Sequence, residues 1–467
     1  MLKYRLSKQA IPAMSHFIVA DRKTDFLLPP SVEDWLGEDH LARFVVEVID
    51  QLDLSNLTRK YAGRGSKAHH PATLLAILVY GYATGVFSSR KLETATYDSV
   101  AFRYIAANTH PDHDTLATFR RRFLDDLAAL FVQVLEMAQE MKLLKLGTVC
   151  LDGTKIHANA SRHSALSHGH IVKLQTQIEL EVQELMALAE QADSANIPDG
   201  MSLPEELKLR QDRLEAMAVA KAKIAQRAAQ RYAKEKAEFD AKMDKRAAKE
   251  EETKKKPRGK PPTPPVAGAR DTDQINLTDE ESRIMPVSGG GFEQAYNAQA
   301  AVDASTMLVV ATGVTQATND KEQVAPMLHT LQAQAPQLGA AQILIADTGY
   351  CSEKNILACG QANVTALIAV AREDHHPHWS DRHTQPPPLA EGATPVQTMA
   401  HSLKTLAGAA TYALRKQTVE PVFGIIKSVM GFRQFSLRGL KKVSGEWNLV
   451  CLAWNVKRMA VLRLKTA

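Results

Sequence analysis

The spacing of apolar residues predicts that residues 1–146 are helical. Apolar residues recur three and four positions apart between residues 41 and 52, which places them on one face of a helix. Pro71 suits the first turn of another helix, and Gly85 suits its end. Short helices joined by tight turns favour a helical DNA-binding domain of the helix-turn-helix type, with a helical dimerisation domain as the alternative.

The pattern changes at Gly147. The run TVCLDGT, which follows it directly, predicts a short buried strand. From residue 171 the chain is again helical, and its apolar residues keep the spacing of a coiled coil on both sides of a polar break at 194–200. Residues 171–269 therefore predict an inserted helical hairpin that ends in the basic, proline-rich linker KKKPRGKPPTPP.

Strands return after the linker. Two apolar runs at 295–304 and 307–315 predict a β-hairpin, and two further strands alternate with helices before a proline- and histidine-rich loop. A helix containing Pro421 and further basic helices complete the chain. This order predicts an α/β core made of residues 147–170 and 270–467, with basic helices at its C-terminal end.

Composition then narrows the class of protein. Of the 467 residues, 45% are hydrophobic and 23% are charged, which excludes a disordered or fibrous chain. The four cysteines have neither metal-ligand nor disulfide spacing, the N-terminal segment lacks the apolar region of a secretory signal, and no apolar run has the length of a transmembrane helix. We therefore expect a cytoplasmic protein with no membrane partner.

Positive charge is concentrated in two parts of the chain. The formal net charge is only +5, yet residues 411–467 carry 11 Lys and Arg against two acids, a net charge of +9. Residues 59–122 carry ten Lys and Arg against four acids, a net charge of +6. Two such blocks suit the phosphate backbone of a nucleic acid, and the alternative is two solvated helical faces.

Three acidic residues stand at positions that suit phosphoryl-transfer chemistry. Asp152 and Asp347 end predicted strands, and Glu420 lies on a later helix within the basic C-terminal block. Carboxylates that meet at the edge of an α/β sheet are suitable ligands for Mg²⁺, and two such ions promote displacement at phosphorus. Taken singly, each aspartate is at least as well explained as a turn residue, and Glu420 is better explained as a helix-surface acid, so it is their order along the chain that favours a site.

The motifs around these acids resemble those of the DDE transposases of bacterial insertion sequences. The similar stretches are VCLDGTKIHANAS, GGFEQAYNAQAAVD, ILIADTGY and YALRKQTVEPVFGIIKSVM, and HPATLLAILVYGYATGVFSSRKLE resembles the helical N-terminal domain of that group. The resemblance covers nearly the whole chain. It implies an RNase H-like catalytic core, a mixed sheet flanked by helices, that cleaves DNA strands and transfers them with Mg²⁺ or Mn²⁺.

The resemblance also implies roles for single residues. Asp152, Asp347 and Glu420 would be the catalytic triad and the metal ligands. The residues expected to contact DNA phosphate are Tyr412, Arg415 or Lys416, Lys427 and its basic neighbour Arg433. Three residues separate Lys416 from Glu420, which is the family's usual spacing, whereas four residues separate Arg415 from Glu420. The choice between the two therefore stays open.

The implied partners are the terminal inverted repeats of the element and target DNA, with a homodimer in the synaptic complex and a nucleoid-associated location. One alternative is an RNase H-like DNA nuclease without strand transfer. Another is a non-catalytic DNA-binding protein derived from a transposase. These alternatives differ in their products, because only the transposase joins the DNA strands that it cuts.

Two further groups of residues have competing interpretations. Trp447 and Trp454 are seven positions apart on one helix face, which favours packing in the core over stacking on an extruded base. For a group of four histidines in the late loop, a DNA-contacting segment is favoured over a zinc site, since no cysteine or helical spacing accompanies them: His375, His376, His378 and His383.

Overall fold

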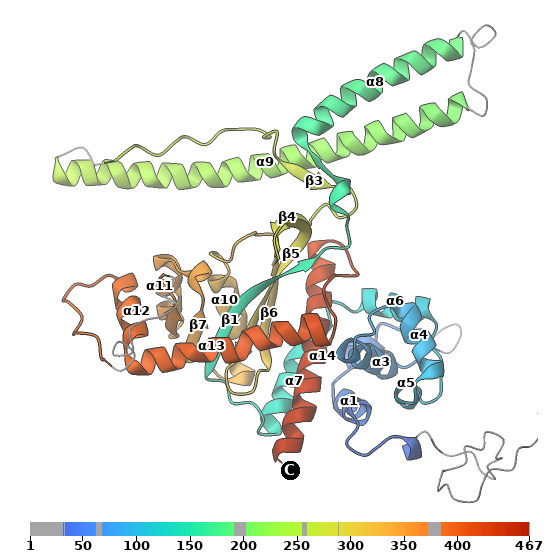
Figure 1. Ribbon diagram of the computed structural model, residues 1–467, viewed down its shortest axis with the longest axis vertical. Coiled ribbons are helices and arrows are strands. Elements are labelled where there is room, and N and C mark those ends of the chain that lie inside the picture. The colour runs from blue at the N-terminus through green and yellow to red at the C-terminus, as the bar shows by residue number, and fades with distance from the viewer. Residues whose placement is uncertain are drawn as a thin grey trace, which may run out of the picture.

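The computed structural model describes residues 31, 33–61, 68–190, 202–254, 259–287, 289–371 and 384–466. The four histidines at 375–383 lie outside these residues. Figure 1 shows a central sheet with a group of short helices beside it and a long helical hairpin above it. The catalytic residues implied by the resemblance all belong to the central part.

The N-terminal part is helical, as the apolar spacing predicts. Its helices are η1 (Glu33–Trp35), α1 (Leu41–Asp50), α2 (Ser55–Thr58), α3 (Pro71–Thr84), α4 (Ser89–Asp98), α5 (Val100–Ile105), α6 (His113–Arg122) and α7 (Leu127–Glu140). Helix α3 begins at Pro71, where the side chain of His70 accepts a hydrogen bond from Ala72 N, and it ends at Gly85 in the left-handed conformation with φ 87°. Most of α3 is buried.

The central sheet is mixed. Its strands are β1 (Thr148–His157), β4 (Arg283–Pro286), β5 (Phe292–Asp303), β6 (Val309–Thr315), β7 (Ile343–Ala346) and β8 (Thr365–Ile368). The order is β4-β5-β1-β7-β8, and β6 also pairs with β5. Strand β5 is antiparallel to β1, β4 and β6, whereas β7 is parallel to β1 and β8 is parallel to β7. The prediction of a mixed sheet flanked by helices is confirmed.

The helices of the core are α10 (Val324–Leu338), η3 (Thr348–Tyr350), α11 (Glu353–Gln361), α12 (Pro395–Lys404), α13 (Leu406–Gly424), the π-helix η5 (Ile425–Val429) and α14 (Leu440–Thr466). Helix α14 packs against β6 on one side and against α1, α3 and α7 on the other. Its indoles bond to the hairpin of the sheet, Trp447 to Gln299 O and Trp454 to Met307 O, each at 2.9 Å. The packing role of both tryptophans is confirmed.

The N-terminal helices and the sheet share one continuous apolar core, which runs from Leu36 to Met459. Several basic residues of α14 are used in this packing. Lys457 donates to Ala83 O at 2.8 Å, and Arg458 donates to Thr306 O at 2.7 Å. The C-terminal basic block is therefore not a uniform DNA-binding face, because part of its charge holds the helix in place.

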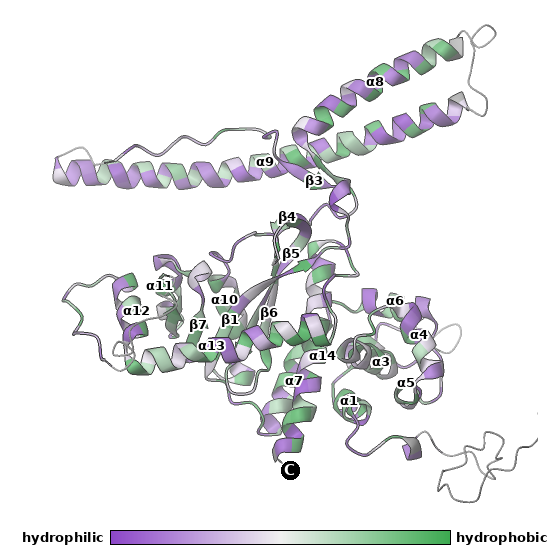
Figure 2. Cartoon of the chain, in the orientation of Figure 1, coloured by the Kyte–Doolittle hydropathy of each residue, from purple (hydrophilic) through white to green (hydrophobic). Residues whose placement is uncertain are grey.

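The inserted segment forms the predicted hairpin. After η2 (Arg162–Ser164) and β2 (Ala165–Ser167) come α8 (His168–Glu190) and α9 (Leu203–Thr253), and β3 (Gln274–Asn276) pairs with β2. A small apolar cluster joins the two helices near the sheet and includes Ile178 and Met217. At about 1.5 Å per residue, α9 is more than twice as long as α8. Its second half extends beyond α8, is largely hydrophilic (Figure 2) and is accompanied by the returning chain, as in the hydrogen bonds of Arg231 to Gly268 O and of Arg246 to Gly259 O.

Among the described helices, none is by itself long and apolar enough to cross a membrane. The bent pair α3 and α4 meets the requirement by length and composition only.

Candidate active site

Asp152 and Asp347 lie on neighbouring parallel strands at the same level. Leu151 of β1 pairs with Ala346, the last residue of β7. The next residue in each segment is therefore one of the two aspartates, with Asp152 still within β1 and Asp347 directly after β7. Asp347 begins the turn η3, because its Oδ1 accepts a hydrogen bond of 2.8 Å from Gly349 N. The structure thus brings the two acids to one edge of the sheet.

Glu420 reaches the same edge from α13, which packs against β1 and buries Val419 and Val422. Arg415, on the same helix, joins the three acids. Its Nη2 lies 2.9 Å from Asp152 Oδ2 and 3.6 Å from Asp347 Oδ2. Its Nη1 lies 2.9 Å from Glu420 Oε1. The three carboxylates singled out in the sequence therefore surround one cationic side chain.

The acids differ in their exposure. The side chains of Asp152 and Arg415 are 15% and 14% exposed, whereas those of Asp347 and Glu420 are 38% and 50% exposed, so the cluster opens to solvent on the side of the latter two. Burial raises the pKa of Asp152 to about 6 against the opposing charge of Arg415, and the charge of Asp347 raises it further. Burial opposes the charge of Arg415, but the neighbouring carboxylates outweigh it and raise the pKa of the guanidinium.

Two charged residues in this cluster, Asp320 and Lys155, do not stand out in the sequence. Asp320 precedes α10 and accepts hydrogen bonds of 2.7 Å from Asn297 Nδ2 and from Gln299 Nε2. Lys155 Nζ lies 3.9 Å from Asp320 Oδ1. Lys155 follows Asp152 within the quoted motif, and this is the only signal in the sequence for either residue.

Gly153 leaves the room for Asp320 and its partners. A Cβ at this position would lie 2.2 Å from Gln299 Nε2 and 2.6 Å from Asp320 Oδ1, both far inside van der Waals contact. The glycine after the first aspartate is therefore required by close packing rather than by an unusual backbone angle.

The other predicted DNA contacts lie on and after α13. Tyr412 stands about one turn before Arg415 on α13. Burial lowers the pKa of Lys427, and the charges of Lys155 and Arg433 lower it further. Arg433 Nε donates to Lys427 O at 3.0 Å. These basic residues therefore form a group beside the carboxylates, whereas Lys416 is exposed.

The donor set suits a hard divalent cation. Three carboxylates offer only oxygen ligands, as Mg²⁺ and Mn²⁺ prefer, and they already surround one positive charge. Within the described residues, no three Asp, Glu, His or Cys side chains are close enough to hold a metal ion as they stand. Arg415 occupies the space between the acids, so they fit a divalent ion once this side chain has turned away.

Two segments of the chain match known protein families. Residues 30–122 match the family described as "Transposase domain (DUF772)", and residues 269–456 match the family described as "Transposase DDE domain". The second segment contains Asp347 and Glu420 but not Asp152. The chain gives no significant match to a curated protein or to a solved structure.

The two matched segments together span more than half of the chain, and both families are transposases. Members of the DDE family cut DNA strands and transfer them, generally with divalent metal ions. The three acids singled out in the sequence converge in this fold on one guanidinium. The chain belongs to the DDE transposases of insertion sequences.

Proposed function

We propose that Asp152, Asp347 and Glu420 are the catalytic carboxylates of this transposase and that they bind Mg²⁺ or Mn²⁺. The observation that carries the proposal is their common contact with the Arg415 guanidinium, because it places three carboxylates around one cationic group at the same edge of the sheet. Asp152 lies outside the matched residues, and its place beside Asp347 on adjacent parallel strands supports its inclusion.

The sheet supports an RNase H-like core in the finer sense. Strands β6, β5 and β1 form an antiparallel series, and β7 and β8 continue the sheet in parallel with β1. The first acid then lies on the central strand, the second follows its parallel neighbour, and the third comes from a helix that crosses that edge. The insertion of 171–269 lengthens the chain between the first two acids without separating them in space.

A bound divalent ion would activate a water or a DNA 3′-hydroxyl and stabilise the leaving oxygen. The chain's own residues would do the remaining work. Asp152 and Asp347 would present their carboxylate oxygens to the metal ion at the sheet edge, and Glu420 would add its carboxylate oxygens from α13. Arg415, once released from the carboxylates, has a planar fork of donors that suits a phosphate oxygen, and its position supports it over Lys416 as the phosphate contact.

The remaining basic residues would hold the DNA backbone. Lys155, Lys427 and Arg433 stand beside the carboxylates, where they can neutralise phosphate charge, and Tyr412 lies near Arg415. We also propose that residues 1–146 bind DNA, that residues 147–170 and 270–467 form the catalytic core, and that a homodimer pairs the terminal inverted repeats with target DNA at the nucleoid.

The test of this function is an assay with purified protein and DNA that carries the terminal repeats of the element. We expect nicked and joined products in Mg²⁺ or Mn²⁺ and no products in EDTA. Nicked DNA without joined products would identify a nuclease, and binding without cleavage would identify a non-catalytic DNA-binding protein. Either result would contradict the proposal, and gel analysis of labelled strands separates the three outcomes.

Removing Arg415 is expected to increase metal affinity in the absence of DNA. In the Arg415→Ala variant, three carboxylates lose a cation whose charge-assisted hydrogen bonds contribute about 1.5–3 kcal/mol each. Even one such bond corresponds to roughly 10- to 100-fold in apparent Mn²⁺ affinity. Titration calorimetry measures this affinity, and Arg463→Ala, which removes a partly buried arginine paired with Glu47, is the matched control. Unchanged affinity in Arg415→Ala would show that Arg415 and the metal do not compete.

A further inference from the structure

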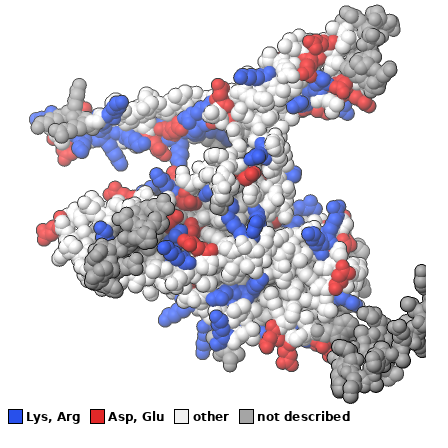
Figure 3. Space-filling view, viewed as in Figure 1, with Lys and Arg blue, Asp and Glu red and all other residues white. Residues whose placement is uncertain are grey.

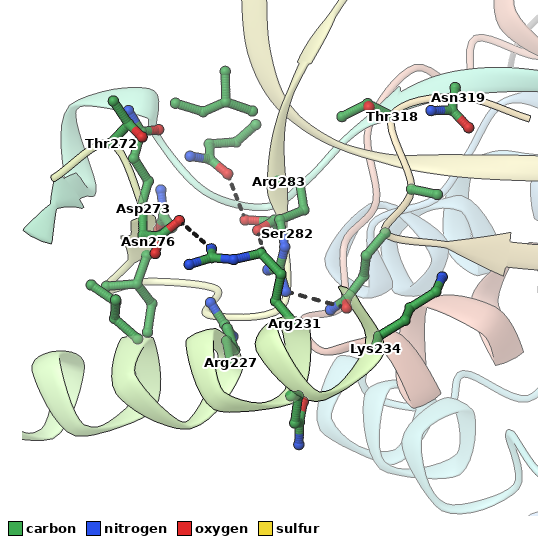
Figure 4. Close-up of a pocket in the computed structure, with 18 of the residues that line it drawn as sticks. Arg227, Arg231, Lys234, Thr272, Asp273, Asn276, Ser282, Arg283, Thr318 and Asn319 are labelled. Carbon is green, nitrogen blue, oxygen red and sulfur yellow. Dashed lines mark hydrogen bonds and ion pairs between the residues drawn. The ribbon is translucent and has the colours of Figure 1, made fainter. Parts of the chain in front are cut away.

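A second polar site lies between the hairpin and the sheet, separate from the carboxylates. It is a cavity of about 880 Å³ bounded by α9, by strands β3 and β4, and by residues 316–322 after β6 (Figure 4). Cavities of about 300–1,000 Å³ are typical of sites for ligands the size of a nucleotide. The question is which chemical group the walls of this cavity would bind.

Arginine side chains from two elements face each other across the cavity. Arg227 and Arg231 come from α9, and Arg283 comes from β4 (Figure 4). Arg231 Nη1 pairs with Asp273 Oδ1 at 2.6 Å, but its Nε and Arg227 Nη1 are buried without a hydrogen-bond partner. Buried donors of this kind are normally satisfied in folded proteins. Their presence here points to an acceptor that belongs in the cavity.

The charge of the lining points the same way. Five basic side chains line the cavity against two acidic ones, and the basic ones are Arg227, Arg231, Lys234, Arg283 and Lys321. Burial lowers the pKa of Arg283 to about 10, and the positive charge of Arg227 lowers it further. Both guanidinium groups are still charged near neutral pH, so they repel each other. An anion between them would relieve this repulsion, and guanidinium forks match phosphate oxygens well.

The position of the cavity connects it to the active site. In the segment that follows β6, Gln316, Asn319 and Lys321 line the cavity. Asp320, in the same segment, instead accepts hydrogen bonds from β5 within the carboxylate cluster. One short stretch of chain thus separates the two sites.

We propose that this cavity, called the cleft from here on, binds a phosphodiester group of the DNA strand held in the active site. Helix α9 would then hold the DNA against the core. The proposal rests on the proposed function, since it takes the substrate to be DNA. Figure 3 shows Lys and Arg side chains on α9, interspersed with Asp and Glu, and further Lys and Arg on the core below it. The inserted hairpin would then be a part of the DNA-binding surface.

The test measures DNA binding by the Asp347→Asn variant, which is the parent for all further substitutions because it is expected to bind DNA with little cleavage. Adding Arg227→Gln is expected to weaken binding of repeat-end DNA about tenfold near 0.1 M salt and to reduce the slope of log Kd against log salt by about 1. Lys242→Gln, on the exposed part of α9, is the matched control and is expected to leave both unchanged. Arg227→Lys keeps the charge and is expected to restore most of the slope.

A second measurement does not depend on the stability of the arginine variants. Thr318 is an exposed residue of the cavity wall, and DNA is expected to protect the thiol of Thr318→Cys from alkylation. If the parent binds DNA, an unchanged slope together with an unprotected thiol would overturn the proposal that the cleft binds DNA. A parent that does not bind DNA would overturn the proposed function itself. Protection by inorganic phosphate but not by DNA would assign the cleft to a small anion and also overturn the proposal.

Discussion

The Asp347→Asn protein is expected to bind repeat-end DNA as the wild type does and to cut it about 10³-fold more slowly or worse. The substitution removes one of the charges that surround Arg415 and replaces a carboxylate oxygen by an amide nitrogen, which is not a metal ligand. Because we propose that the same carboxylates serve both cleavage and strand transfer, joining of the DNA strand is expected to fall in parallel.

The fold is expected to survive this change. Asp347 Oδ1 accepts a hydrogen bond from Gly349 N, and an asparagine oxygen can accept the same bond. Asp125→Asn is the matched control, since Asp125 is 68% exposed and pairs only with Lys441 in the described structure. It is expected to cut DNA at the wild-type rate. Full nicking by Asp347→Asn in Mg²⁺ or Mn²⁺ would remove this residue from the catalytic triad.

Replacing Glu446 by alanine is expected to lower the free energy of unfolding by about 3–5 kcal/mol. This carboxylate is fully buried on α14, where it accepts hydrogen bonds from Tyr82 OH at 3.0 Å and from the backbone N–H groups of Ser436 and Leu437. Arg120 Nη1 donates to the same Tyr82 oxygen at 3.0 Å. Alanine would leave the Tyr82 hydroxyl and the two backbone donors without this acceptor, and it would remove the negative charge that faces the buried Arg120.

Thermal or urea unfolding measures this loss. Glu47→Ala removes an exposed partner of Arg463 and is expected to cost no more than about 1 kcal/mol. Equal unfolding midpoints for Glu446→Ala and Glu47→Ala would contradict the buried network. Such a result would also show that this network contributes little to the packing of α3 against α14.

The same carboxyl group predicts a pH dependence. Burial raises the pKa of Glu446 above its usual value of 4.5. Between pH 4.5 and the raised pKa of the folded state, the folded protein holds the proton more tightly than the unfolded chain does. The contribution of this group to stability therefore falls as pH rises through this range. Glu446→Gln lacks this titration, and its unfolding free energy relative to the wild type is expected to increase with pH above about 4.5. A difference that does not change with pH would contradict the raised pKa.

Much of the fold follows from local patterns in the sequence. The helical N-terminal part, the mixed core and the inserted hairpin all appear where apolar spacing predicts them, because each element buries one face and repeats with its own period. The pairing of Asp152 with Asp347 also follows in outline, since both acids stand at strand ends. Whether the two acids lie side by side depends on the register of β1 against β7, which no local pattern specifies.

Other parts of the site depend on contacts between distant segments. Arg415 and Lys416 are neighbours in the sequence, and only the packing of α13 against β1 turns Arg415 toward the carboxylates and leaves Lys416 exposed. Asp320 joins the cluster through hydrogen bonds from β5. The cleft under α9 exists because the hairpin folds back over β4, more than 50 residues away from Arg227 along the chain.

Glu446 shows the limit most clearly. It stands on the same helical stripe as Val443 and Val450, so its spacing already places it on the buried face. In the sequence, however, this acid stands within the basic C-terminal block, residues 411–467, where most charged residues are Lys or Arg. Only the contact of α14 with Tyr82 explains why a buried acid is tolerated there. The sequence by itself determined the elements, their order and the chemical types of the active-site residues, since these depend on local periodicity and side-chain chemistry. Tertiary structure decided which charges meet one another, because this depends on how distant elements pack.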